Sequence, residues 1–421
     1  MKRFFPTFVL LLLTYFQTVQ SASALSLPEA VDIALSQNPS LSQSQKAVET
    51  ADQQLKIAKG QRGFALTLSG SADSNKSEGV DISESAAARL TASVPLYSGG
   101  KLQANIRAAD IYTQICQLDF LQAADDLAYQ VAIAYVDALE GRATHQVDCE
   151  TRDNLASHEQ LISDLYTAGA KAKIDFLRAQ VETSNANQDA VKSLASYEVS
   201  LTNLATLLSL DAISDLNLVD IAPKTADYQL PDVESCIFEA EQSRSDLIAD
   251  YLRIQRGEQQ LKSAKSAWLP SLNASASTGF NAQSDSWKPT NSATAGLSAS
   301  WNVFDSHVTR AEVDSAKIEL ERLALALKTD TDSAHSEVIS AHKNLSSALS
   351  RLETTQIAVN LAVEERYIAT EKYRAGEGIL LDVLDAEVAL STAKKNHVSA
   401  RYDVLRYQFA LRHALGNTFP K

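Results

Sequence analysis

The sequence predicts an α+β membrane protein whose chain is built twice, each copy combining a β-hairpin with a very long helical hairpin. Three observations lead to this fold class: a repeated motif, paired stretches of alternating hydrophobicity, and helical patterns approaching 70 residues. The motif begins at Tyr166 and again at Tyr373, and its Tyr, Ala-Gly, Asp, Leu, Ala and Val residues recur at a constant offset of 207 positions. Self-similarity at a fixed period indicates a duplicated architecture.

Further landmarks extend the repeat over most of the chain. Gln53-Gln54-Leu55-Lys56 returns as Gln259-Gln260-Leu261-Lys262, and we match Leu27-Pro28-Glu29 with Leu230-Pro231-Asp232. The expected division is a first repeat at 25–210, a connector at 211–231, a second repeat at 232–416 and a C-terminal tail at 417–421.

Residues 1–24 have the pattern of a secretory signal peptide. A Lys-Arg pair at positions 2 and 3 precedes an apolar stretch from Phe8 to Phe16, and Ala22-Ser23-Ala24 offers the small residues of a cleavage site. The apolar stretch is shorter than the roughly 20 residues of a membrane-spanning helix. We therefore expect an exported protein.

Composition excludes several classes of function. The formal net charge is −14 and no basic cluster is present, which argues against nucleic acid as a partner. Three widely spaced cysteines do not form a disulfide framework. His335 and His342 are seven residues apart, beyond the i, i+4 spacing that chelates a metal on a helix, and the sequence shows no nucleophile constellation. We expect no enzymatic activity, no cofactor and no metal site.

Each repeat contains two stretches of alternating hydrophobicity, expected as β-hairpins at 64–97 and 271–304. About ten residues per strand, with one apolar and one small polar face, are typical of transmembrane β-strands that turn the apolar face to lipid and the polar face to a lumen. A half-buried soluble sheet shares this pattern, but the export signal favours the membrane. Aromatic residues cluster at the strand ends: Tyr97, Trp268, Phe280, Trp287, Trp301 and Phe304.

Each second strand runs directly into a very long helix, expected at 101–167 and 307–374, or roughly 100 Å at 1.5 Å per residue. Shorter helices are expected at 39–60, 175–209, 234–267 and 382–414. Their lengths indicate that each long helix is faced by two shorter helices stacked end to end.

A glycine ends each long helix and an aspartate follows it. Gly169 and Gly376 break the helical pattern, and we place Asp175 and Asp382 at the N-caps of the return helices. Each copy of the motif is therefore predicted to be the end of a helical hairpin.

With these motifs in place, the mature chain resembles the TolC-like outer membrane efflux protein family, the outer membrane channel component of tripartite efflux and type I secretion systems. The most specific stretches are Pro95-Leu96-Tyr97-Ser98-Gly99-Gly100 and the second hairpin end, from Tyr373 through Gly376 to Asp382-Val383-Leu384. The resemblance implies a homotrimer whose protomers each give four strands to a twelve-stranded outer membrane β-barrel, continued in the periplasm by an α-helical barrel. Physical reasoning agrees that copies must assemble, because four strands cannot close a barrel.

The resemblance also implies a function and its site. The family acts as a passive exit duct from the periplasm of Gram-negative cells. In it, aspartates after the tip glycine narrow the pore, and Asp175, Asp382 and Asp385 match those positions. Three-fold symmetry would turn each aspartate into a ring of like charges that favours cations. The alternative is that the first two only cap helices.

Partners are implied by the same resemblance. Gly169, Ala170, Gly376 and Glu377 match the surface that docks a periplasmic adaptor (membrane fusion) protein bound to an inner-membrane ABC exporter or proton-driven pump; the alternative for the glycines is a plain C-cap. Gly378 stands where several members have an arginine that helps hold the closed state, so that contact is in doubt here.

The competing hypothesis from another class is an exported coiled-coil scaffold or adhesin without a pore. It accounts for the long helices but gives the alternating hairpins no purpose. Drug efflux, metal efflux and protein secretion all share the channel architecture, and substrate identity resides in the transporter and adaptor.

Overall fold

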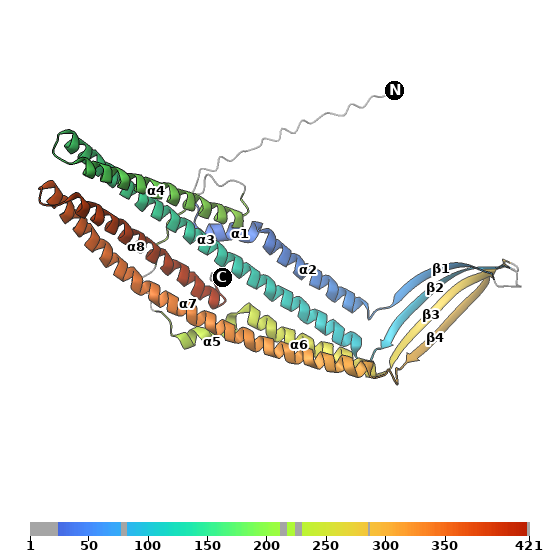
Figure 1. Ribbon diagram of the computed structural model, residues 1–421. Coiled ribbons are helices and arrows are strands. Elements are labelled where there is room, and N and C mark those ends of the chain that lie inside the picture. Colours follow the sequence, from blue (N-terminus) through green and yellow to red (C-terminus); the bar gives the residue numbers. More distant parts are fainter. Residues whose placement is uncertain (1–23, 77–81, 211–216, 224–229, 285–286, 419–421) are drawn as a thin grey trace, which may run out of the picture.

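The computed structural model describes residues 24–76, 82–210, 217–223, 230–284 and 287–418. The chain is elongated, with a four-stranded sheet at one end and the ends of two helical hairpins at the other (Figure 1). The expected signal peptide lies outside the described residues except for its last residue.

The order of elements is the same in both halves of the chain. The first half contains α1 (Leu27–Gln37), α2 (Pro39–Gly60), β1 (Ala65–Asn75), β2 (Ser83–Tyr97), α3 (Lys101–Thr167) and α4 (Lys173–Leu207). The second half contains α5 (Val233–Ser243), α6 (Ser245–Lys265), a 3₁₀ turn (Ser266–Trp268), β3 (Ser271–Gln283), β4 (Thr290–Ser300), α7 (Val308–Arg374) and α8 (Leu380–Ala414). Helices α3 and α7 both have 67 residues, and α4 and α8 both have 35.

The helix expected at 234–267 is instead two helices, because the chain is extended at Arg244 (φ −68°, ψ 118°). Asn38 has nearly the same conformation between α1 and α2 (φ −67°, ψ 124°). The first break is readable because Pro39 follows it and disfavours a helical residue before it. Nothing comparable follows Arg244, whose break depends on side-chain contacts described below.

The equivalence of the two breaks also corrects one sequence match. Helices α1 and α5 begin at Leu27 and Val233 and both have 11 residues. Matching Leu27-Pro28-Glu29 with Leu230-Pro231-Asp232 is therefore wrong, because the latter segment precedes α5.

The second hairpin ends earlier than expected, at Ser300 rather than 304. The chain leaves the sheet to enter α7 through Ser306 and His307, which have positive φ angles of 53° and 72°. The Asp305 carboxylate accepts a hydrogen bond of 2.8 Å from the Thr309 backbone N–H and so caps the first turn of α7.

The four strands form one antiparallel sheet in the order β1-β2-β3-β4. Its register aligns apolar side chains on one face, as in the row Leu66, Ala92, Ala276 and Ala295. The next row, on the opposite face, is Thr67, Thr91, Ser277 and Thr294. The predicted pattern of one apolar and one polar face is confirmed. Strands β1 and β4 lie at the two edges, and neither pairs with a further strand of the described chain.

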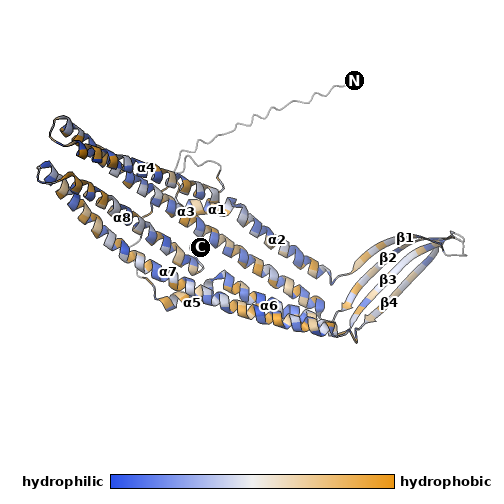
Figure 2. Cartoon of the chain, in the orientation of Figure 1, coloured by the Kyte–Doolittle hydropathy of each residue, from blue (hydrophilic) through white to orange (hydrophobic). Residues whose placement is uncertain are grey.

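The helices lie side by side in a layer that continues from the sheet. Near the sheet, α2 packs against α3, α3 against α6, and α6 against α7; near the hairpin ends, α4, α3, α8 and α7 pack in the same sequential way. Helices α2 and α4 therefore border one edge of the layer and α7 the other (Figure 1). Apolar and polar residues are interspersed along every helix (Figure 2). No helix in the described ranges combines the length and apolar character needed to cross a membrane.

The described part of the connector lies against the helices. Leu218 forms a parallel bridge with Leu25. The Tyr135 hydroxyl of α3 donates to the carbonyl oxygens of Leu25 (2.7 Å) and Val219 (2.8 Å), which fixes both segments to the layer. Arg401 of α8 pairs with Asp220 at 2.7 Å.

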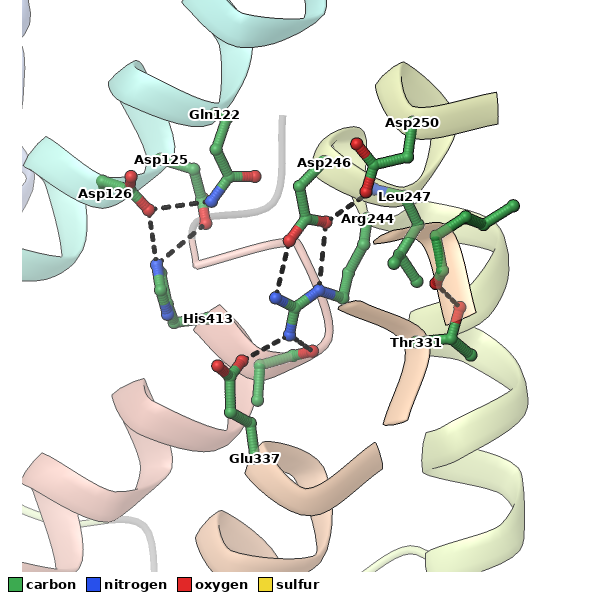
Figure 3. A network of polar contacts seen from close by, with 12 residues as sticks. Gln122, Asp125, Asp126, Arg244, Asp246, Leu247, Asp250, Thr331, Glu337 and His413 are labelled. Carbon is green, nitrogen blue, oxygen red and sulfur yellow. Dashed lines mark hydrogen bonds and ion pairs between the residues drawn. The ribbon is translucent and has the colours of Figure 1, made fainter. Parts of the chain in front are cut away.

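A polar network at mid-length holds the ends of the shorter helices in place (Figure 3). The Arg244 guanidinium contacts Asp246 and Glu337, each at 2.7 Å, and donates to the Ala414 carbonyl at 3.4 Å. It thereby joins the break before α6 to α7 and to the end of α8.

The end of α8 is also joined to α3. His413 Nε2 lies 2.9 Å from Asp126 Oδ1, and this hydrogen bond lowers the pKa of Asp126. Thr418 of the expected tail is buried, and its N–H and hydroxyl both donate to Asp125 at 2.9 Å.

The fold predicts that a methyl group at Gly279 disrupts the β2–β3 pair. A Cβ there would lie 2.3 Å from the Ala88 carbonyl oxygen, whereas a Cβ at Gly296 on β4 would meet nothing within 4 Å. We expect Gly279→Ala to destabilise the protein by about 1–3 kcal/mol and to lower its folded yield. Gly296→Ala is the matched control and should leave the thermal unfolding midpoint, followed by circular dichroism, close to that of the wild type.

Candidate functional site

The two hairpin ends are built on the same local geometry. Gly169 follows α3 with φ 75°, and Gly376 follows α7 with φ 79°. In each, the glycine N–H and the next N–H bond back to carbonyls of the last turn, as in Ala170 to Leu165 (2.8 Å) and Glu377 to Lys372 (2.9 Å). A Cβ on either glycine would meet nothing within 4 Å, so the left-handed backbone, and not crowding, selects glycine.

The aspartates are not the N-caps that the sequence indicated. Helix α4 begins at Lys173 after the extended residue Ala172, and α8 begins at Leu380 after Ile379. Asp175 and Asp382 are thus the third residues of their helices, and neither helix has a side-chain cap hydrogen bond. Both carboxylates still lie in the first turn, where the helix dipole favours negative charge.

Asp382 and Asp385 lie together on one face of α8, both exposed and separated by one turn. Asp175 is half-exposed and belongs to the other hairpin. The structure therefore brings two of the three predicted constriction residues onto one surface of the chain. The four predicted docking residues, Gly169, Ala170, Gly376 and Glu377, are all exposed at the hairpin ends.

The same face of α8 continues into a polar groove between α3, α4 and α8. Val388, Thr392 and Lys395 follow Asp385 along this face and line a cavity of about 140 Å³. A neighbouring cavity of about 490 Å³ shares Lys395, Asp148 and Asp189 with it. Its charged lining consists of Asp137, Glu140, Asp148, Asp189, Lys192 and Lys395. Carboxylates therefore outnumber ammonium groups in this lining. Lys395 forms an ion pair with Asp148 at 2.5 Å.

The two hairpin ends of the chain contact each other. Lys171 Nζ, from the first, lies 4.4 Å from the centre of the Tyr373 ring in the second. Below this contact, Ile162 and Ala179 pack in one apolar cluster with Leu380 and Val383. The two hairpins therefore share a core at their ends.

A buried carboxylate lies just below this shared core and was not singled out from the sequence. Glu387 of α8 is 2% exposed and accepts a hydrogen bond of 2.7 Å from Asn154 of α3. Its other oxygen lies 3.7 Å from Arg366 Nε of α7. The signal was present, because Glu387 interrupts an otherwise apolar helix face that includes Leu384 and Leu390.

Gly378 differs from the tip glycines in being crowded. A Cβ there would lie 3.1 Å from the Tyr373 nitrogen and 3.2 Å from Lys372 atoms. An arginine at this position would require the turn to move. This turn therefore has room only for glycine at position 378. Within the described ranges, no group of three or more His, Cys, Asp or Glu side chains is placed to hold a metal ion.

Comparison with known proteins gives a consistent result. The model of the family described as outer membrane efflux protein matches residues 30–209 and 236–417. The outer membrane efflux protein BepC of Brucella suis is 22% identical over 418 residues, covering 95% of this chain and 87% of its own.

Two solved structures have the same fold. The outer-membrane channel OprN has a TM-score of 0.82 at 21% identity, covering 93% of this chain and 90% of its own. The outer membrane protein VceC of Vibrio cholerae has a TM-score of 0.81 at 20% identity, covering 93% of this chain and 96% of its own.

A pH dependence follows from His158 of α3, whose pKa is lowered mainly by burial, with the Glu387 charge opposing this. A histidine kept neutral in the folded state loses stabilising free energy as the pH falls from about 6.5, its unfolded value, toward its lower folded value. We expect the thermal unfolding midpoint to fall between pH 7.5 and 5.5, and His158→Gln to reduce that fall. An identical pH dependence in the variant would contradict this assignment.

Proposed function

Because the chain belongs to the outer membrane efflux protein family, we propose that it forms the outer membrane exit duct of an export machine. The protein is located in the outer membrane and extends into the periplasm. In the proposal, three copies surround a single pore and conduct substrates passively, in efflux or type I protein secretion. The energy comes from an inner-membrane ABC exporter or proton-driven pump, to which a periplasmic adaptor connects the duct.

The open edges of the sheet carry this proposal. Strands β1 and β4, of 11 residues each, leave a row of backbone N–H and C=O groups without a strand partner on their outer sides. In a membrane each unsatisfied group costs several kcal/mol. Pairing β4 of one copy with β1 of the next satisfies both edges. A pore-free scaffold gives these edges no partner.

Strand number favours three copies over two. Two copies would give an eight-stranded barrel, whose interior is just filled by side chains, whereas three copies would give a twelve-stranded barrel wide enough for a water-filled lumen. A conducting duct therefore needs at least three copies of a four-stranded sheet.

The helical layer has matching edges. Helices α4 and α7 border its opposite sides near the hairpin ends, and each exposes large apolar residues at its surface. The following residues have relative exposures between 54% and 67%: Ile174, Val181, Val191 and Val199 on α4, and Ile318, Leu325, Ile357 and Leu361 on α7. Packing of α7 against α4 and α2 of the next copy would cover these residues on the same side on which β4 meets β1.

One charged residue orients the sheet in the proposed barrel. Arg89 of β2 belongs to the polar row with Ser69, Gly279 and Ser292, whereas Leu68 and Leu90 lie on the opposite face. Placing an arginine toward lipid at the bilayer midplane costs about 2–4 kcal/mol. The polar face is therefore assigned to the lumen and the apolar face to lipid.

The hairpin ends then form the periplasmic mouth. Asp382 and Asp385 would supply two carboxylate rings, and Asp175 a third. The exposed turns at Gly169-Ala170 and Gly376-Glu377 would receive the adaptor. Conformational constraint and docking are compatible roles for the glycines, because the left-handed turn leaves the surface beside them open.

Planar-bilayer conductance tests the duct and its mouth together. We expect the purified oligomer to conduct ions, with block by millimolar divalent cations added from the periplasmic side, because closely spaced carboxylates repel one another and bound cations relieve that repulsion. Asp382→Asn with Asp385→Asn should weaken the block by about tenfold or more. The matched control, Glu49→Gln with Asp52→Asn on α2, removes the same number of charges far from the mouth and should leave the block unchanged. Identical block in all three proteins would place the constriction elsewhere.

Adaptor docking is tested at Gly376. Alanine and tryptophan both pay the cost of a left-handed backbone, about 1–2 kcal/mol, but only tryptophan fills the open surface beside the turn. We expect Gly376→Trp to reduce export and adaptor cross-linking while oligomer abundance stays close to that of Gly376→Ala. Equal export by the two variants would argue against docking at this turn.

A further inference from the structure

Arg89 is the only basic residue in the four described strands. The other charged residues in these strands are Asp73 and Glu84. Asp73 lies level with Ser85, four residues along β2 from Arg89, or roughly 13 Å at 3.3–3.4 Å per residue. Glu84 is an odd number of positions from Arg89, so its side chain points to the opposite face.

The Arg89 guanidinium has a neutral partner. Its Nη1 donates a hydrogen bond of 3.0 Å to Ser277 Oγ, and Arg89 forms no ion pair with any residue that the structure describes. Its own row contributes only Ser69, Gly279 and Ser292, which are too small to cover it. Arg89 is accordingly exposed on the polar face with its positive charge uncompensated.

We propose that Arg89 forms a ring of positive charge, the Arg89 collar, in the lumen of the β-barrel, which is the exit section of the duct. This collar favours anionic solutes there, namely those that carry carboxylate, sulfate or phosphate groups. This inference rests on the proposed function, because three-fold assembly with the polar face inward places three such residues at one height. The collar is opposite in sign to the carboxylates of the mouth. A solute leaving the duct would thus meet an acidic entrance and a basic exit section.

The collar acts through its electric field and does not bind a solute by direct contact, because a twelve-stranded barrel is wide. Charges across a water-filled lumen influence ions only within about one Debye length, which is roughly 30 Å at 0.01 M salt and 3 Å at 1 M. Selectivity due to Arg89 must therefore be strong in dilute salt and vanish in concentrated salt. Neutral lining by Ser, Thr and Gly has no such dependence.

The test is the anion-to-cation permeability ratio, from reversal potentials in potassium chloride gradients across planar bilayers. The background carries Asp175→Asn, Asp382→Asn and Asp385→Asn, so that the carboxylates of the mouth do not dominate selectivity. In this background we expect Arg89→Gln to lower the ratio by about twofold or more near 10 mM salt, and to have no effect near 1 M. Arg89→Lys should retain the ratio, and Ser277→Ala, which removes only the hydrogen-bond partner, should also retain it.

A second variant keeps the test independent of removing Arg89. Ser69→Lys adds a charge in the same row and should raise the ratio in dilute salt. Unchanged ratios in both Arg89→Gln and Ser69→Lys channels would overturn the collar while leaving the duct intact. Absence of any conductance in the background protein, despite assembled oligomer, would instead overturn the proposed function.

Discussion

The need to satisfy backbone hydrogen bonds at the two outer strands is the main constraint on how this molecule can be arranged in a membrane. Strands β1 and β4 each present unpaired peptide groups on one side, and a lipid bilayer offers no water to satisfy them. In the proposed assembly, the sheet therefore closes on itself through further copies. The helices at the two edges must then also meet neighbouring copies, because α2 leads directly into β1 and α7 follows β4. Each edge of the sheet is thus continued by helices, α2 and α4 on one side and α7 on the other, and large apolar residues are exposed on α4 and α7.

Duplication makes a regular wall possible from a single chain. The two long helices are equal in length, as are the two return helices. In the proposed assembly each copy therefore supplies two similar units to a ring. The units differ where specific interactions occur. The first hairpin end presents Lys171, which reaches Tyr373 of the second, and only the second carries the crowded Gly378. The break before α6 is held by Arg244 where its counterpart has Asn38 and a proline.

Features encoded locally could be predicted from the sequence, and features that depend on distant contacts could not. Alternation with period two predicted the two faces of the sheet, and Gly169 and Gly376 marked the left-handed turns because other residues rarely adopt that backbone.

The Arg244 break escaped prediction since its partners, Asp246, Glu337 and Ala414, converge only in the folded chain. The N-cap positions of Asp175 and Asp382 were wrong by one helical turn, because the extended residues before α4 and α8 are Ala172 and Ile379, which carry no capping side chain. Glu387 stood out locally as a charge on an apolar helix face, but its partners on α3 and α7 come together only in the folded chain.

The number of chains in the membrane-extracted particle tests the central claim most directly. Native mass spectrometry of the detergent-solubilised protein, with the detergent removed in the gas phase, counts the chains without assuming a shape. Closure of four-stranded sheets into a conducting barrel predicts a particle of three mature chains. A particle of one or two chains that nevertheless conducts ions would contradict the account.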